Sequence, residues 1–132
     1  MKILILGGTG EVGHMLCKRL SSSHQVFTTL RTNNDLNSVN FFSKVLPETN
    51  CIIIDDIKDE KELKNVINNI NPDLIINCIA VIKHRDSCVP GNFAAEYINS
   101  IFPHFLKNEC EVRNIKLIHL STDCVFSGDR GY

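Results

Sequence analysis

The feature that most constrains the fold of this chain is its alternation of short apolar runs with longer segments whose apolar residues recur at helical spacing. The runs predict strands at residues 3–6, 25–30, 51–54, 73–79 and 116–120. The longer segments predict helices at residues 11–22, 41–46, 59–70 and 93–112. Strands that are apolar on both faces are typical of parallel sheets covered on both sides, and their crossovers are right-handed. The sequence therefore predicts an α/β fold, a Rossmann-like doubly wound parallel sheet of about five strands in the order 3-2-1-4-5.

Helical spacing also predicts which side chains reach the core. The residues expected to be buried are Val12, Met15, Leu16 and Leu20 in the first helix and Leu63, Val66, Ile67 and Ile70 in the third. Pro103 removes a backbone donor from the last helix, so we expect a kink or a new helix start near it. His119 lies in the fifth apolar run, where a buried structural role is favoured over proton transfer.

Length, charge and cysteine spacing narrow the class of protein. The chain has 132 residues, which suits one domain spanning 1–132. Its formal net charge of -1 argues against a strongly basic nucleic-acid binder, and no apolar run approaches the roughly 18 residues of a membrane span. The six cysteines lie at least ten positions apart, so no zinc-ligand spacing occurs and no metal site is expected. Core-forming segments without a signal peptide favour free thiols and a cytoplasmic location.

Three glycines with the spacing GxxGxxG, Gly7, Gly10 and Gly13, join the first predicted strand to the first predicted helix. In a dinucleotide-binding loop they allow a tight turn, a close approach of the backbone to a pyrophosphate, and close packing of the helix on the sheet. The helix N-terminus offers unpaired N–H groups and a partial positive charge to the phosphates. A ligand-free tight turn is the alternative, but the strand before the loop and the helix after it favour nucleotide binding. A P-loop is disfavoured because no Gly-Lys-Ser/Thr follows.

The end of the second predicted strand bears on the choice of dinucleotide. An acidic residue there would bind the adenosine ribose of NAD, but residues 24–34 contain no Asp or Glu. Arg31 lies there instead, and its guanidinium suits a 2′-phosphate because it can donate two parallel hydrogen bonds. We therefore favour NADP(H) over NAD(H), with a solvated arginine as the alternative.

Further motifs follow the later strands. They are Asp56-Ile57, Pro72-Asp73-Leu74-Ile75-Ile76-Asn77-Cys78, Asn99-Ser100-Ile101-Phe102-Pro103-His104, and the run from His119 to Gly128, which reads HLSTDCVFSG. With the glycine loop, these motifs resemble the N-terminal half of an extended short-chain dehydrogenase/reductase. Within that superfamily they are most similar to the dTDP-4-dehydrorhamnose reductase family of sugar-nucleotide reductases. The last motif is the most specific, because generic strand chemistry rarely produces it.

The resemblance implies roles for individual residues. Asp56 would hydrogen-bond the adenine and Ile57 would pack on it, while Asn99 would help to organise the site. Thr122 matches the catalytic Ser/Thr, whose hydroxyl hydrogen-bonds the substrate carbonyl or hydroxyl. The cofactor-binding residues implied in this way are Gly7, Thr9, Gly10, Glu11, Val12, Gly13, Asp56, Ile57, Cys78, Ile79, Ala80, Asn99 and Ser121, beside Arg31.

Ordinary structural roles are the alternatives for several of these residues. Asp56 could cap the following turn, and Thr122 could simply end a strand. Asn77 could satisfy backbone groups between strands. The basic cluster Lys83-His84-Arg85 could face a sugar diphosphate, but a solvated loop is favoured.

The reaction that the resemblance implies is NADPH-dependent reduction of a dTDP-linked 4-keto-6-deoxy sugar, a step of dTDP-rhamnose and polysaccharide biosynthesis. In this superfamily a Tyr-x-x-x-Lys motif donates the proton, because the lysine lowers the pKa of the tyrosine. The sequence lacks the motif, since Ile101 lies four residues after Tyr97 and Tyr132 is the last residue. We therefore expect an NAD(P)-binding domain that is incomplete at its C-terminus and inactive alone.

Two other functions stay open. The chain could be a non-catalytic NADP(H)-binding regulatory module, or part of another extended short-chain epimerase or dehydratase acting on a nucleotide sugar. A nucleotide-sugar substrate is the expected partner in the enzymatic cases, and homo-oligomer formation stays open.

Overall fold

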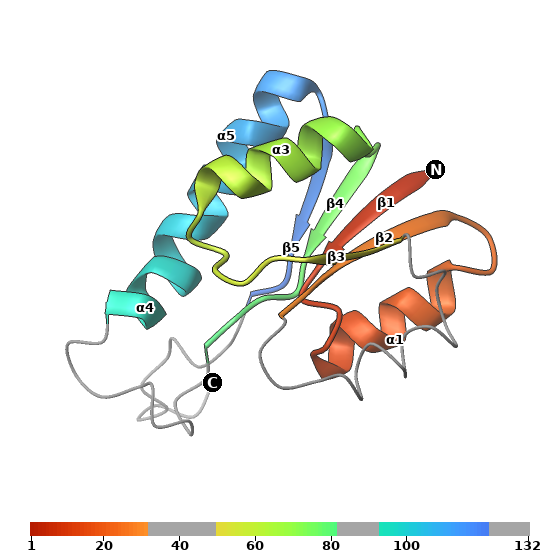
Figure 1. Ribbon diagram of the computed structural model, residues 1–132, viewed down its shortest axis with the longest axis horizontal. Helices are drawn as coiled ribbons and strands as arrows, with labels where there is room; N and C mark the ends of the chain where they lie inside the picture. The colour runs from red at the N-terminus through yellow and green to blue at the C-terminus, as the bar shows by residue number, and fades with distance from the viewer. Residues whose placement is uncertain (32–49, 82–92, 122–132) are drawn as a thin grey trace, which may run out of the picture.

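The computed structural model describes residues 1–31, 50–81 and 93–121. These residues contain a five-stranded parallel sheet in the order β3-β2-β1-β4-β5 (Figure 1). The strands are β1 (Lys2–Leu6), β2 (Gln25–Leu30), β3 (Cys51–Ile53), β4 (Leu74–Asn77) and β5 (Lys116–His119). The predicted fold class and strand order are confirmed. The helix predicted at 41–46 lies outside the described residues.

Helices cover both faces of the sheet (Figure 1). One face carries α1 (Glu11–Leu20), and the other carries α3 (Glu60–Ile70) and α5 (Phe102–Arg113) side by side. α5 continues directly from α4 (Phe93–Glu96) through a π-helical turn, η3 (Tyr97–Ile101). None of the helices in the described part of the chain has the length and apolarity needed to cross a membrane.

Each face of the sheet has its own core. Leu4 and Leu6 of β1 contribute to the core beneath α3 and α5, whereas Ile3 and Ile5 contribute to the core beneath α1. Successive side chains of a strand point to opposite faces, so one strand supplies both cores. The core beneath α3 and α5 also contains Ile54, Leu63, Ile67, Ile70, Ile75, Phe102, Leu106, Cys110 and Ile115. The predicted buried face of α3 is confirmed, with Val66 partly buried at its edge.

The buried face of α1 agrees with the prediction only in part, because Leu16 and Leu20 pack against the core beneath α1 but Val12 and Met15 do not. Val12 and Met15 are 53% and 59% exposed, whereas Gly13 and Cys17 are buried. The reason is the contact of α1 with the loop before it. A Cβ atom at Gly13 would collide with the Gly7 carbonyl oxygen, so the helix is turned with its side-chain-free position toward the loop. Apolar spacing misses this rotation because glycine gives no hydrophobic signal.

β5 is more exposed than its apolar sequence suggests. Leu117 packs against the core beneath α3 and α5, but Ile118 is 48% exposed and His119 is also exposed. Within the described residues β5 pairs only with β4, which leaves it at the edge of the sheet. The expectation that His119 is buried is therefore wrong.

The helix ends follow local sequence chemistry. The Asp59 side chain accepts a hydrogen bond from the Glu62 N–H at 2.9 Å and caps α3. Asn71 and Asn114 end α3 and α5 in the left-handed conformation, which asparagine tolerates. At Pro103 the predicted irregularity is confirmed as the π-helical turn, in which the Phe102 N–H bonds to the Tyr97 carbonyl five residues earlier. The wider turn suits a proline, which lacks an N–H and would clash with an α-helical carbonyl.

Candidate functional site

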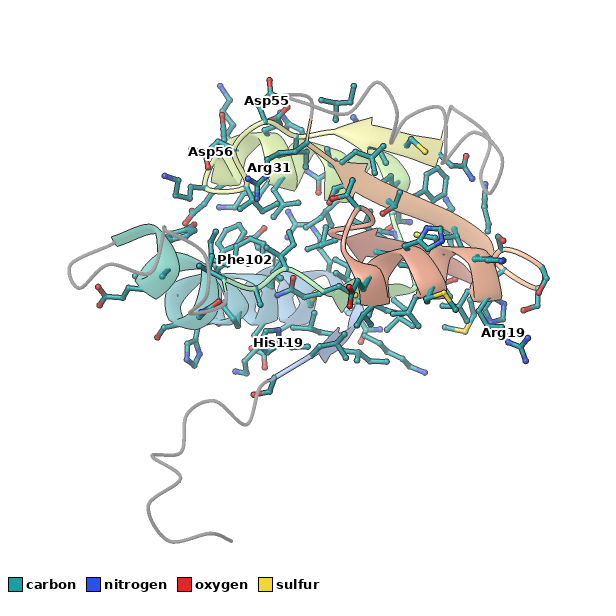
Figure 2. The ribbon with its side chains drawn as sticks, turned by 90° about the horizontal axis from the view of Figure 1, so that it is seen from below. Arg19, Arg31, Asp55, Asp56, Phe102 and His119 are labelled. Carbon is teal, nitrogen blue, oxygen red and sulfur yellow. The ribbon has the colours of Figure 1, made fainter. Side chains whose placement is uncertain are left out.

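The carboxyl ends of all five strands meet at one edge of the sheet, because the strands run parallel. Figure 2 shows Arg31, Asp55 and Asp56 grouped at this edge, with Arg19 at the opposite end of the molecule. The loops after β1, β3, β4 and β5 leave from the same edge. The structure thus gathers there the described residues that the sequence singles out, and it places Asn99 on the neighbouring η3. The predicted catalytic residue Thr122 lies outside the described residues, and Ser121 just before it is exposed.

The loop between β1 and α1 is held tightly by β2. The Gly7 N–H donates to Thr29 Oγ1 at 3.1 Å, and the Gly8 N–H donates to the Thr29 carbonyl at 3.1 Å. Thr28 is fully buried, and its hydroxyl donates to the Ile5 carbonyl at 2.9 Å. Gly7 has a φ of +86°, a conformation that suits glycine. Two threonines of the neighbouring strand therefore fix the path of the glycine loop.

The contacts that a side chain would make differ among the glycines of the loop. At Gly7, an added Cβ would lie 2.9 Å from Ile79 Cγ1 of the loop after β4. At Gly8 it would collide with the Thr28 side chain, and at Gly13 with the Gly7 carbonyl oxygen. Three of the four glycines are thus required by contacts within the protein.

Gly10 is the exception. It has an ordinary φ of −73°, and an added Cβ would meet no atom closer than the Gly7 carbonyl oxygen at 3.5 Å. Gly10 is also the N-cap residue of α1, where a glycine supplies no side chain to cap the helix. The helix therefore presents backbone N–H groups and the positive end of its dipole at the sheet edge. Nothing in the described protein requires glycine here, and the absence of a side chain leaves room for a ligand against the backbone.

The end of β4 lies directly beside the glycine loop. The Cys78 N–H donates to the Leu6 carbonyl at 3.0 Å, and Ile79 reaches the position above Gly7. Asn77 is fully buried, accepts a hydrogen bond from the Ile79 N–H at 3.1 Å, and bonds through Nδ2 to His119 Nδ1 at 3.1 Å. The Asn77 side chain therefore joins the ends of β4 and β5 through the His119 ring, and it satisfies one backbone N–H of its own loop rather than backbone groups between strands.

Asn99 holds the next residues of the same loop. Its Oδ1 accepts from the Val81 N–H at 2.9 Å, and its Nδ2 donates to the Val81 carbonyl at 2.8 Å. Both polar ends of the amide are therefore engaged with a single backbone position. Asn99 thus holds the loop after β4, and its contact with a cofactor stays a prediction.

The loop after β3 carries Asp56 and Ile57. Asp56 Oδ1 accepts from the Lys58 N–H at 3.0 Å, and Oδ2 lies 3.6 Å from Lys58 Nζ. This is the turn-capping role that the sequence left as an alternative. Each carboxylate oxygen can accept a further hydrogen bond, so the cap leaves acceptor capacity for a ligand. Ile57 is partly buried against the core beneath α3 and α5.

Arg31 directly follows β2 at the neighbouring strand end. The Ile54 N–H donates to the Leu30 carbonyl at 2.9 Å, so Arg31 leaves the sheet beside Asp55. Arg31 is exposed, and it forms no ion pair with another residue of the described ranges. Its guanidinium lies at the sheet edge near Asp55 and Asp56 (Figure 2).

The thiols of the described residues are core groups. Cys17, Cys78 and Cys110 carry free thiols, and Cys51 packs against the core beneath α1. Burial raises the pKa of Cys17 to about 11, despite its hydrogen bond with Thr28, and burial also raises the pKa of Cys78. Thiols with raised pKa values are poor nucleophiles, so they act here as small apolar groups. The described residues contain no group of three or more His, Cys, Asp or Glu side chains placed to hold a metal ion.

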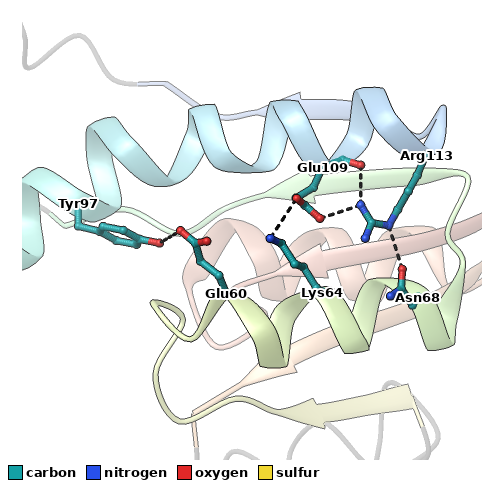
Figure 3. A network of polar contacts seen from close by, with 6 residues as sticks. All are labelled: Glu60, Lys64, Asn68, Tyr97, Glu109 and Arg113. Carbon is teal, nitrogen blue, oxygen red and sulfur yellow. Dashed lines mark hydrogen bonds and ion pairs between the residues drawn. The ribbon is translucent and has the colours of Figure 1, made fainter.

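Sequence reasoning missed the residues that support the site. Thr28 and Thr29 fix the glycine loop, Val81 is the position that Asn99 holds, and Tyr97 bonds to Glu60 (Figure 3). A pair of threonines at the end of an otherwise apolar strand is the one signal in the sequence that could have drawn attention to the first two.

Comparison with known proteins places the chain. The model of the family described as "RmlD substrate binding domain" matches residues 1–132. The chain belongs to this family. A dTDP-4-dehydrorhamnose reductase from Burkholderia thailandensis is 28% identical over 130 residues, which are 98% of this chain and 36% of that protein. A dTDP-4-keto-6-deoxy-D-glucose reductase from Streptomyces niveus is 36% identical over 73 residues, which are 55% of this chain and 25% of that protein.

A solved structure agrees with this membership of the RmlD family. The crystal structure of a hypothetical dTDP-4-dehydrorhamnose reductase from Sulfolobus tokodaii matches with a TM-score of 0.77 and 27% identity. The match covers 99% of this chain and 42% of that one. The resemblance to extended short-chain dehydrogenase/reductases of the dTDP-4-dehydrorhamnose reductase type is confirmed. The chain spans less than half the length of each of these relatives.

The contrast between Gly13 and Gly10 can be tested by stability measurements. We expect Gly13→Ala to lower the free energy of unfolding by about 1–3 kcal/mol, because its Cβ meets backbone that cannot easily move. Gly10→Ala should cost less than about 1 kcal/mol, the range of a changed helix cap. Urea denaturation of both variants checks this, and equal losses would contradict the packing described for α1.

Proposed function

We propose that this chain is the dinucleotide-binding part of an NADPH-dependent reductase that acts on a nucleotide-linked 4-keto-6-deoxy sugar. Membership of the RmlD family and the names of the two reductases that it resembles support the reaction class. The geometry at the carboxyl edge of the sheet supports the dinucleotide.

The observation that carries the proposal is the open space beside the backbone of Gly10. At the other loop glycines a side chain would collide with neighbouring atoms of the protein. At Gly10 it would collide with no atom of the described residues. A pyrophosphate held against the backbone at this position would explain the glycine, because any side chain would keep the phosphates away. The uncapped N-terminus of α1 supplies the hydrogen-bond donors and the positive end of the helix dipole.

Different residues around the loop would bind different parts of the dinucleotide. The backbone N–H groups of Glu11 and Val12 would bind the pyrophosphate, whereas the Gly10 N–H already donates to the Gly7 carbonyl at 3.1 Å. Asp56 and Ile57 would bind the adenine, and residues 78–80 would line the ribose and phosphates between the glycine loop and β4. The dinucleotide would supply the hydride, while the protein orients it and excludes water.

Substrate activation is proposed for Thr122, which follows β5 in the sequence and lies outside the described residues. Thr122 would donate a hydrogen bond to the sugar carbonyl and so stabilise the charge that develops on its oxygen. No Tyr-x-x-x-Lys occurs among the 132 residues, so the proton donor of this superfamily has no counterpart in the chain. We therefore propose that the chain binds the dinucleotide without turning substrate over.

Titration of NADPH fluorescence with wild-type protein and with Gly10→Ala tests the site. Wild type should bind, and Gly10→Ala should bind at least about tenfold more weakly while it stays folded, because its methyl group occupies the place of the pyrophosphate. Met15→Ala is the matched control, since Met15 is 59% exposed on the same helix and its truncation adds no methyl group to the backbone of the loop.

The same samples distinguish the candidate functions. Binding of NADPH without oxidation when a dTDP-linked 4-keto-6-deoxy sugar is added is the expected result. A robust rate of oxidation would show that the chain contains its own proton donor. A flat titration with wild-type protein would contradict both the reductase and the regulatory-module proposals.

The preference for NADPH is proposed to come from Arg31. We expect Arg31→Ala to weaken NADPH binding about tenfold, the effect of losing a paired, charge-assisted hydrogen bond, and to leave NADH binding unchanged. Arg19→Ala is the control, because Arg19 is an exposed arginine in the last turn of α1, far from the sheet edge (Figure 2). Tighter binding of NADH than of NADPH to the wild type would contradict the assignment.

A further inference from the structure

The π-helical turn η3 contacts two of the loops that surround the proposed dinucleotide site. Asn99 holds the loop after β4 through both backbone groups of Val81, as described above. Two residues earlier in the same turn, the Tyr97 hydroxyl donates to Glu60 Oε1 at 3.2 Å (Figure 3). Glu60 is the first residue of α3, which directly follows the loop after β3.

Glu60 belongs to a short segment with many local hydrogen bonds. The Asp59 N–H donates to the Asp56 carbonyl at 2.9 Å, and the Lys58 N–H donates to Asp56 Oδ1 at 3.0 Å. The Asp59 side chain then caps α3 by accepting from the Glu62 N–H at 2.9 Å. Consecutive hydrogen bonds therefore connect Asp56 with the first turn of α3, where Glu60 lies.

Tyr97 is itself well fixed. Its ring is packed against the core beneath α3 and α5, and its centroid lies 6.3 Å from that of Phe102. Burial, together with the nearby carboxylate of Glu60, raises the pKa of Tyr97 above its ordinary value. The hydroxyl therefore keeps its proton at neutral pH and acts as a donor.

Docking of α3 on α5 does not depend on this hydrogen bond. Farther along the same pair of helices, Lys64 Nζ lies 3.4 Å from Glu109 Oε1, and Arg113 bonds to Glu109 at 2.7 Å and to Asn68 at 2.9 Å (Figure 3). The contacts of Lys64 with Glu109 and of Arg113 with Asn68 join the two helices away from the carboxyl edge of the sheet, while the bond between Arg113 and Glu109 lies within α5. The contact between Tyr97 and Glu60 is the one in this network that lies next to the proposed adenine loop.

We propose that Tyr97 is a positioning residue for dinucleotide binding, which holds Asp56 and Ile57 in place through Glu60. Through Tyr97 and Asn99, η3 connects the segment that follows β3 with the loop after β4. The inference rests on the proposed function and adds to it a residue that would not touch the ligand.

Removal of the Tyr97 hydroxyl should weaken binding of the adenine half of the ligand and leave binding of the nicotinamide half unchanged. In NMR titrations we expect Tyr97→Phe to raise the Kd for adenosine 2′,5′-bisphosphate about threefold, which is the effect of one exposed hydrogen bond. The Kd for nicotinamide mononucleotide should not change, and neither should the midpoint of urea denaturation. A purely structural role would change the two affinities together.

Four further variants test whether the effect comes from the bond between Tyr97 and Glu60. Glu60→Gln keeps an oxygen acceptor for the hydroxyl and should retain an affinity near that of the wild type. Glu60→Ala should reproduce the loss of Tyr97→Phe, and the double variant should lose no more, because both remove the same bond. Lys64→Gln is the matched control, since it breaks another contact between the same two helices and should leave adenosine 2′,5′-bisphosphate binding unchanged.

The outcomes separate this inference from the function on which it rests. Equal affinity of Tyr97→Phe and wild type for adenosine 2′,5′-bisphosphate would overturn the positioning role alone. An equal loss of affinity for both probes would also overturn it. If wild-type protein bound neither probe, the proposed function would fail and the inference would fail with it.

Discussion

The close approach of α1 to the loop before it is the contact on which the rest of the structure depends. Gly13 lies against the backbone carbonyl of Gly7, where any side chain would collide. This contact determines which face of α1 is buried, and it leaves Val12 exposed. It also directs the uncapped N-terminus of the helix toward the carboxyl edge of the sheet. Gly13 therefore determines both how α1 packs on the sheet and where the N-terminus of α1 lies in the candidate site.

The fold could be predicted from the sequence because its signals are local. Apolar runs and helical spacing locate all five strands and the described helices, and right-handed crossovers leave one strand order. The errors concern burial. Met15 is exposed because the packing of a glycine, which no hydrophobic pattern records, turns α1, and His119 is exposed because β5 lies at the edge of the sheet in the described part of the chain.

The candidate site could be predicted only in part. Glycine spacing locates the loop after β1, and the parallel sheet brings the other strand ends beside it. The bonds that hold these loops could not be predicted, because they join residues far apart in the sequence, such as Asn99 with Val81 and Tyr97 with Glu60. Their geometry depends on the π-helical turn at Pro103, and the sequence predicted only that some irregularity would occur there.

Binding of NADPH at the glycine loop is the central claim, and amide chemical shifts test it most directly. In ¹H–¹⁵N spectra recorded during a titration with NADPH, we expect the largest changes at Gly10, Glu11 and Ala80. The amides of Asn114 and Lys116, at the opposite end of the sheet, should stay unchanged. Changes centred on Asn114 and Lys116, or no changes at all, would contradict the placement of the dinucleotide against the N-terminus of α1.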